Sequence, residues 1–295
     1  MLILGLILGV CLFTSAKFPR FRMWKLKCTS CVANVSKPRA LFFALILTAA
    51  STWLTWSGVA ADVDRSDKSE VTAVDGSEFH FARLQYSGGI ADSVKNWYTD
   101  YPEMDDHLSR LARRLTGINV GAPTVVEPMN PNIFAFPMIY SVEPEQMDLS
   151  PEDAANLREY LAHGGFWFAD DFHGDKELDK FLHQVQRVLP EATAVELDTS
   201  HPLFHSFYDI ENIVQVTNDG IATCGDCDQW ENGPSGKIPK VFAIVDGHDR
   251  ICILMAWNTD LGDGLEWADD PDYPAKYSAY AFKFLTNVIM YAMTH

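Results

Sequence analysis

The feature of this sequence that most constrains its fold is a short run of apolar residues between two helical patterns. Residues 166–169 read Phe-Trp-Phe-Ala and follow directly on the pair Gly164-Gly165. A half-exposed strand alternates apolar and polar side chains, so an uninterrupted apolar strand flanked by helices is expected to be buried on both faces. A mostly parallel sheet covered by helices on both sides provides that environment.

The neighbouring segments carry the signals of helices. Ser150, Pro151 and Asp153 supply an N-cap, a first-turn proline and a capping-box acid for a helix that ends at Gly164-Gly165. Helical spacing of apolar residues predicts further helices over 102–115, 176–189 and 275–293. Strands are predicted over 79–86, 124–127, 134–140, 241–245 and 251–256. This alternation predicts a single doubly wound α/β domain over residues 79–295, after a polar linker at 62–78.

The charges divide the chain into two parts. Residues 1–61 contain seven Lys and Arg and no Asp or Glu, whereas residues 62–295 contain 16 Lys and Arg against 40 Asp and Glu. A domain this acidic repels phosphate groups, so nucleic acid and anionic membrane surfaces are not expected as partners. We expect a small ligand or an envelope protein instead, with membrane contact only through the N-terminal segment.

The basic N-terminal part has the features of a targeting region. Residues 40–61 are uncharged, follow Lys37 and Arg39, and end in small residues, as in a secretory signal peptide. If translation starts at Met23, that signal is complete and residues 1–22 are a gene-model extension. The alternative is an uncleaved anchor at 40–61, paired with the short apolar stretch at 1–16. Both interpretations export the domain to the periplasm or cell envelope, because the basic residues between the two stretches stay in the cytoplasm.

The cysteines also bear on the compartment. Cys224 and Cys227 lie three apart in a turn-rich stretch, and in an exported domain this spacing favours a local disulfide over free thiols. A zinc site shared with the second such pair, Cys28 and Cys31, would be lost if the targeting region is removed. Cys252 lies in an apolar run and is expected to be buried.

Acidic side chains follow two of the predicted strands, and ligand sites of open α/β sheets form outside the carboxyl ends of the strands. The residues expected in one crevice there are Asp170, Asp171, His173, Asn258, Asp260, Asp263 and Glu266. On its rim we expect Arg83, Tyr86 or His201. No organic cofactor is predicted, but such carboxylates could bind a divalent cation or transfer protons. Alternatively, these acids accept hydrogen bonds from backbone N–H groups of turns and helix starts.

The segments LREYLAHGGFWFADDFHG and NTDLGDGLEWADD, together with FHFARLQY, NWYTDYP, FPMIY, HPLF and NVIMYAMTH, resemble a bacterial family, domain of unknown function 4159. The resemblance covers residues 79–295 and implies a flavodoxin-like sheet similar to class I glutamine amidotransferases and ThuA-like proteins. Those amidotransferases carry a cysteine at a strand-to-helix elbow. Here the corresponding turn reads Asp170-Asp171-Phe172-His173, so amidotransferase chemistry is not expected.

Two hypotheses of function follow. The first is a non-catalytic, amidotransferase-like domain that binds a ligand or partner. The second is a carboxylate- or metal-dependent hydrolase acting on an envelope or sugar-containing substrate. The sequence contains neither a G-x-S-x-G elbow to supply a nucleophile nor the ligand spacing of a calcium-binding EF-hand loop, which favours the first. The clustering of acidic residues at Asp170, Asp171, Asp260, Asp263 and Glu266 keeps the second open.

Overall fold

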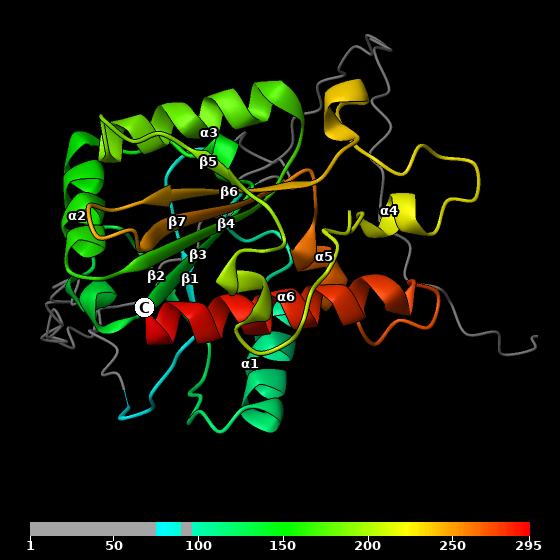
Figure 1. Cartoon of the computed structure of the whole chain (residues 1–295), viewed down its shortest axis with the longest axis horizontal. Coiled ribbons are helices and arrows are strands. Elements are labelled where there is room, and N and C mark those ends of the chain that lie inside the picture. Colours follow the sequence, from blue (N-terminus) through cyan, green and yellow to red (C-terminus); the bar gives the residue numbers. More distant parts are fainter. Residues whose placement is uncertain (1–74, 90–95) are drawn as a thin grey trace, which may run out of the picture. The chain divides into compact units, whose positions relative to one another are not determined.

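The computed structural model describes residues 75–89 and 96–295, which form a seven-stranded sheet with the order β2-β1-β3-β4-β7-β6-β5 (Figure 1). The targeting region expected at 1–61 and all but the last residues of the linker expected at 62–78 lie outside the described residues. Among the helices of residues 75–89 and 96–295, none is long and apolar enough to span a membrane.

The sheet is mostly parallel, as expected. Its strands are β1 (Ala82–Leu84), β2 (Thr124–Val126), β3 (Met138–Val142), β4 (Phe166–Phe172), β5 (Val195–Leu197), β6 (Lys240–Val245) and β7 (Ile251–Trp257). The neighbours β2, β1, β3, β4 and β7 pair in parallel, whereas β6 pairs antiparallel with both β7 and β5. Residues 246–250 join β6 to β7, and so short a connection can form a hairpin but not a parallel crossover.

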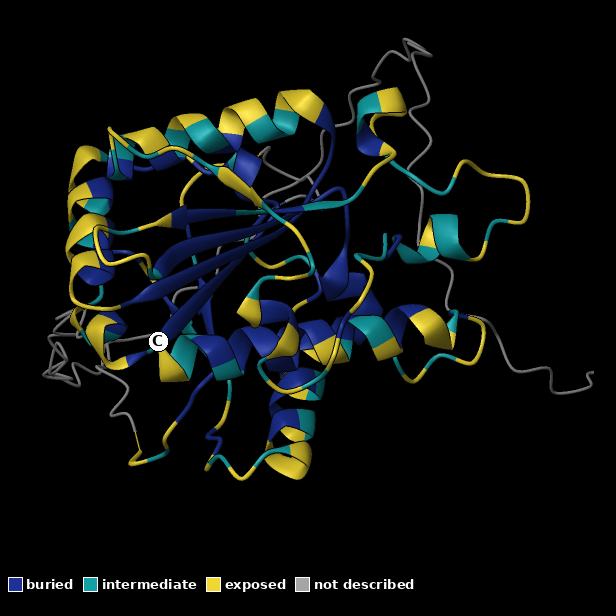
Figure 2. Cartoon of the chain, viewed as in Figure 1, coloured by how far each residue is buried: buried dark blue, intermediate teal, exposed yellow. Residues whose placement is uncertain are grey.

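Helices cover both faces of the sheet (Figure 1). The α-helices of the described residues are α1 (Glu103–Leu115), α2 (Pro151–Ala162), α3 (Gly174–Val188), α4 (Asp219–Ala222), α5 (Leu261–Glu266) and α6 (Ala275–Thr294). Buried side chains of α2 and α3 pack on one face, and those of α1, α5 and α6 pack on the other. In Figure 2 the central strands β1, β3, β4 and β7 are buried along their whole length, the outer strands are partly exposed, and the helices turn their exposed residues outward.

Strand β4 is the centre of this core, and all seven of its residues are buried. Trp167 belongs to the face covered by α3, where its ring lies 5.5 Å from that of Phe181. Phe168 belongs to the opposite face, where its ring lies 6.3 Å from that of Phe284 on α6. The prediction of a strand buried on both faces is therefore confirmed.

Two predicted strands have other boundaries in the structure. The strand predicted at 134–140 begins only at Met138, because Pro131–Ala135 form a 3₁₀ helix that the Asn130 side chain caps by accepting from Asn132 N at 2.9 Å. At its other end, β3 extends two residues beyond the predicted end, to Val142. The first strand is shorter than predicted, since only Ala82–Leu84 have strand geometry. The capping box of Ser150 and Asp153 is present as predicted.

Candidate functional site

Carboxylates from three separate segments converge at the carboxyl edge of the sheet. We call this group the acidic cluster: Asp100, Asp170, Asp171, Asp260, Asp263 and Glu266. Asp100 comes from the loop between β1 and α1, and Asp170 and Asp171 come from β4. Asp260 and Asp263 lie at the start of α5, and Glu266 is its last residue. Asp170 and Asp171 lie within β4, not after it, because a register shift between Ala169 and Phe172 carries the strand on to Phe172.

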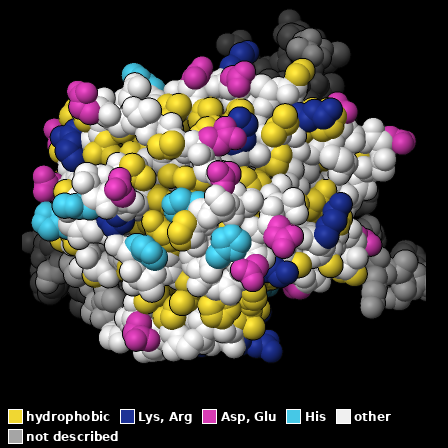
Figure 3. All heavy atoms as spheres, viewed as in Figure 1, with side chains coloured by type: hydrophobic (Ala, Val, Ile, Leu, Met, Phe, Trp, Pro, Cys, Tyr) yellow, Lys and Arg dark blue, Asp and Glu magenta, His cyan; other side chains and the backbone are white. Residues whose placement is uncertain are grey.

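The carboxylates are close enough to share a ligand. One oxygen each of Asp100, Asp171 and Asp260 lie within 4.8 Å of one another, and the same holds for Asp100, Asp263 and Glu266. The aspartates are all buried, so they form an interior cluster and not the lining of an open crevice. On the face shown in Figure 3, acidic and basic side chains are interspersed, and the cluster is not part of a single acidic surface patch there.

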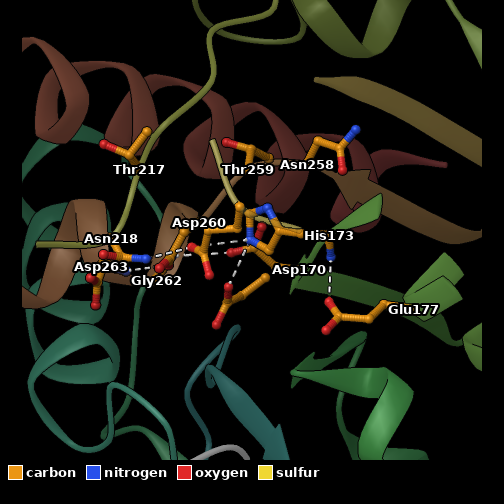
Figure 4. A network of polar contacts seen from close by, with 12 residues as sticks. Asp170, His173, Glu177, Thr217, Asn218, Asn258, Thr259, Asp260, Gly262 and Asp263 are labelled. Atoms are coloured by element: carbon orange, nitrogen blue, oxygen red, sulfur yellow. Dashed lines mark hydrogen bonds and ion pairs between the residues drawn. The ribbon is translucent and has the colours of Figure 1, made fainter. Parts of the chain in front are cut away.

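The start of α5 organises one side of the acidic cluster (Figure 4). Asp260 is the N-cap of this helix, and its Oδ1 accepts from Asp263 N at 2.7 Å. In the first turn, Gly262 N donates to Asp170 Oδ2 at 3.1 Å. Short polar side chains favour such caps because they satisfy N–H groups that the helix leaves free. The Asp170 Oδ1 atom has no hydrogen-bond partner in the described part of the chain.

Two of the predicted residues have mainly structural contacts. Both oxygens of Asp263 accept hydrogen bonds, from Asp219 N at 2.6 Å and from Trp267 Nε1 at 3.3 Å. Asn258 accepts from Gly174 N at 2.7 Å and donates to the carbonyls of Ser235 and Ile238 at 2.8 Å. These contacts match the alternative interpretation, in which acidic and amide side chains hold turns.

Asp100 differs from them. The residue is 7% exposed, and its Oδ2 has no hydrogen-bond partner among residues 75–89 and 96–295. A Cβ atom added at Gly262 would lie 2.0 Å from this oxygen, so only glycine leaves room for the Asp100 carboxylate beside α5. A buried carboxylate without donors is costly unless it binds a proton or a cation.

Arg83 fixes the loop that carries Asp100. It was predicted on the rim of the site, but the structure buries it completely, beneath the loop. Its Nε lies 3.0 Å from both oxygens of the buried Asp105, and its Nη1 donates to the carbonyls of Trp97 and Thr99 at 3.1 and 2.9 Å. The guanidinium is therefore committed to Asp105 and to the loop backbone.

The other two rim predictions have different outcomes. Tyr86 is buried, and its hydroxyl lies 2.8 Å from the carbonyl oxygens of Val142 and Glu143, at the carboxyl end of β3. The prediction for His201 was wrong, because this residue lies at the other end of the sheet. Its ring lies 6.0 Å from that of Tyr291, which in turn lies 6.2 Å from the ring of Phe166, the first residue of β4.

Burial shifts the protonation equilibria of the acidic cluster. It raises the pKa of Asp170 well above its ordinary value, and the charge of Asp171 raises it further. Burial likewise raises the pKa values of Asp100 and Asp260, with added repulsion from Asp263 and Asp171, respectively. It also raises the pKa of Asp263, against the hydrogen bond from Asp219 N. The cluster therefore favours the uptake of positive charge, as protons or as a cation.

His173 lies beside the acidic cluster with one edge of its ring toward two carboxylates. Its Nε2 donates to Asp171 Oδ1 at 3.1 Å and lies 3.8 Å from Glu231 Oε1. Burial alone would lower the pKa of His173, but the hydrogen bond from the ring to Asp171 and the surrounding carboxylates raise it.

Sequence reasoning missed Asp100, Glu231, Glu143 and Glu145, all near this edge of the sheet. It considered only residues directly after apolar strands, whereas the whole loop after β1 also lies at the carboxyl edge. Glu143 and Glu145 do follow a strand, but the predicted end of β3 was two residues too early. No local signal marks Glu231, which lies in the turn-rich stretch after Cys227.

The structure joins Cys224 and Cys227 in a disulfide in this same stretch. Cys252 is a buried free thiol that lies 3.3 Å from the Ile244 carbonyl oxygen.

Comparison with known families identifies a match over most of the described domain. The model of a family described as "Domain of unknown function (DUF4159)" matches residues 80–293 and includes every residue of the acidic cluster. No protein with a curated description matches the chain.

Proposed function

The chain belongs to the family described as domain of unknown function (DUF4159), and we propose that its domain binds a hard divalent cation in the acidic cluster and uses it to hold a small, oxygen-rich ligand. The observation that carries this proposal is Asp100. Its buried carboxylate lies within 4.8 Å of those of Asp171 and Asp260, and its Oδ2 has no hydrogen-bond donor in the described residues.

The chemistry of the site favours Mg²⁺ or Ca²⁺. Both ions prefer carboxylate oxygens, which bind at about 2.0–2.1 Å to Mg²⁺ and about 2.3–2.6 Å to Ca²⁺. Oxygens that share one such ion are therefore about 3–5 Å apart, which fits the three carboxylates. Three carboxylates alone do not complete the coordination shell of either ion, and the remaining positions would accept oxygens of a ligand or water.

The topology supports the finer proposal of an amidotransferase-like, flavodoxin-like domain. The five parallel strands have the order β2-β1-β3-β4-β7, which corresponds to the flavodoxin-like order 2-1-3-4-5. In such sheets the ligand lies where the strand order reverses, here between β1 and β3. Asp100 is carried by the loop after β1, and Glu143 follows β3.

We expect the full-length protein, freed of metal with a chelator, to be stabilised by Mg²⁺ or Ca²⁺. At a concentration 100 times the dissociation constant, the gain is about 2.7 kcal/mol, or roughly 5–10 °C in Tm. Both Asp100→Asn and Gly262→Ala should weaken binding by about 10- to 100-fold, because the first removes a ligand oxygen and the second displaces it. Calorimetric titration and thermal unfolding measure these effects.

Two matched variants serve as controls. Asp179→Asn changes an exposed aspartate on α3, and Gly117→Ala adds a methyl group to open space. Both should bind the cation as the parent protein does. Equal binding by Asp100→Asn and the parent, or no response of the parent to millimolar Mg²⁺ and Ca²⁺, would contradict the proposal.

We also propose that the domain functions outside the cytoplasm. The proposal is supported by the basic N-terminal part preceding an acidic domain, and by the disulfide between Cys224 and Cys227, since disulfides persist mainly in oxidising compartments. A reporter enzyme that is active only outside the cytoplasm, fused after His295, should be active. Activity restricted to a cytoplasmic reporter at the same position would refute export.

A further inference from the structure

We propose that Asp171, His173 and Glu231 hold a second divalent ion, of the Zn²⁺ class, and that Asp171 is shared between the two ions. The inference rests on the proposed function, because the first ion occupies the set of Asp100, Asp171 and Asp260. One ligand atom each of Asp171, His173 and Glu231 lie within 4.8 Å of one another. The three residues come from the end of β4, the N-cap of α3 and the loop between α4 and β6.

The distances suit a tetrahedral ion. Zn²⁺ binds nitrogen and oxygen at about 2.0–2.2 Å, so two of its ligands are about 3.3–3.6 Å apart. His173 Nε2 lies 3.1 Å from Asp171 Oδ1 and 3.8 Å from Glu231 Oε1, on either side of that value. The imidazole is 2% exposed, and its Nδ1 has no hydrogen-bond partner in the described ranges. The polar contacts of the ring are therefore made by Nε2, the atom that faces both carboxylates.

The local charges also favour a cation at this position. Nε2 carries at most one proton, and that N–H donates a hydrogen bond to Asp171, so Glu231 remains as a second carboxylate at ion-pair distance. Within residues 75–89 and 96–295, neither Asp171 nor Glu231 forms an ion pair with Lys or Arg. The guanidinium of Arg83 is already paired with Asp105. A divalent ion at Nε2 would balance both carboxylates at once.

Surrounding contacts hold the three ligands in place. Asn218 Nδ2 donates to Glu231 Oε1 at 2.5 Å, and Asn232 Nδ2 donates to the His173 carbonyl at 2.8 Å. The His173 N–H donates to Glu177 Oε2 at 2.6 Å, which fixes the start of α3. Contacts of this kind orient metal ligands before the ion binds.

The two sets of ligands select different ions. An imidazole favours Zn²⁺ and similar transition metals, whereas a set made only of carboxylates favours Mg²⁺ or Ca²⁺. Because Asp171 belongs to both sets, one carboxylate would bridge the ions. Paired ions about 3.5–4 Å apart occur in many hydrolases, so occupancy of both positions would favour the hydrolase hypothesis over simple ligand binding.

Co²⁺, a spectroscopic substitute for Zn²⁺, tests the inference in the full-length protein saturated with Mg²⁺. We expect a visible absorption band that saturates at one Co²⁺ per chain and is abolished by Zn²⁺. His173→Gln and Glu231→Gln should weaken Co²⁺ binding by more than about 100-fold but leave the Mg²⁺-dependent rise in Tm. Asp100→Asn should do the reverse, and Asp171→Asn should weaken both.

Exposed residues provide the controls, and circular dichroism shows that each variant is folded. His183→Gln on α3 and Glu191→Gln should bind Co²⁺ as the parent does. A Co²⁺ band unaffected by His173→Gln and Glu231→Gln would overturn the second ion while leaving the first. Absence of any Mg²⁺ response together with a band that depends on His173 would overturn the first ion, and with it the shared Asp171.

Discussion

Arg83→Ala is expected to lower the free energy of unfolding by about 3–5 kcal/mol, as measured by urea denaturation. Arg83 and Asp105 are both 0% exposed, and Arg83 Nε lies 3.0 Å from each carboxylate oxygen. Removing the guanidinium leaves an uncompensated buried charge, which costs more than the ion pair itself contributes. The carbonyls of Trp97 and Thr99 lose their donor as well.

Two further variants separate the effect of the buried ion pair from that of the hydrogen bonds between Arg83 and the loop. Arg110→Ala removes an exposed arginine from the same helix as Asp105 and should change stability by less than about 0.5 kcal/mol. The double variant Arg83→Met/Asp105→Leu should recover much of the lost stability, because apolar side chains can replace a buried ion pair. It should still bind Mg²⁺ more weakly, since the loop of Asp100 loses the hydrogen bonds from Arg83 to the Trp97 and Thr99 carbonyls. A cost for Arg83→Ala no greater than that for Arg110→Ala would show that the pair is not buried as described.

The metal-free protein is expected to lose stability as pH rises, with Tm falling by roughly 5–10 °C between about pH 5 and about pH 8. The pKa values of Asp100, Asp170, Asp260 and Asp263 are raised by burial in the folded state. The folded protein therefore binds more protons than the unfolded chain above the ordinary aspartate pKa of about 3.9. The stabilisation is complete below that pKa and is lost as pH rises through the folded values. The raised pKa of His173 acts in the same direction.

Thermal unfolding in chelator measures this dependence, and saturating Mg²⁺ provides the comparison. The cation replaces the protons that the carboxylates lose, so it should flatten the pH profile. Asp170→Asn should also reduce the slope, because it removes one of the groups that titrate. A Tm that is constant or rises from about pH 5 to about pH 8 in chelator would show that these carboxylates are not buried together.

The pattern of residues was sufficient for the elements whose signals are local. The apolar run at 166–169, the capping box at Ser150 and the helical spacing before Met293 each depend on neighbours a few residues away, and each predicted its element correctly. The same reasoning failed at 134–140, where an Asn-Pro start to a 3₁₀ turn outweighed the apolar pattern. His201 was misplaced because a residue in a loop has no local signal for the end of the sheet at which it lies.

The sequence by itself determined the α/β class, the central buried strand and the carboxylates at the ends of β4 and β7, because periodicity and parallel pairing place those residues at one edge. Only the tertiary structure decided that Asp100 and Glu231 join them, and that the histidine beside them is His173 and not His201. Asp100 and Asp263 are brought together through Arg83, which is buried beneath the loop, and through Gly262, which leaves space for a carboxylate. Such contacts depend on packing between segments far apart in the chain, and no short-range pattern encodes them.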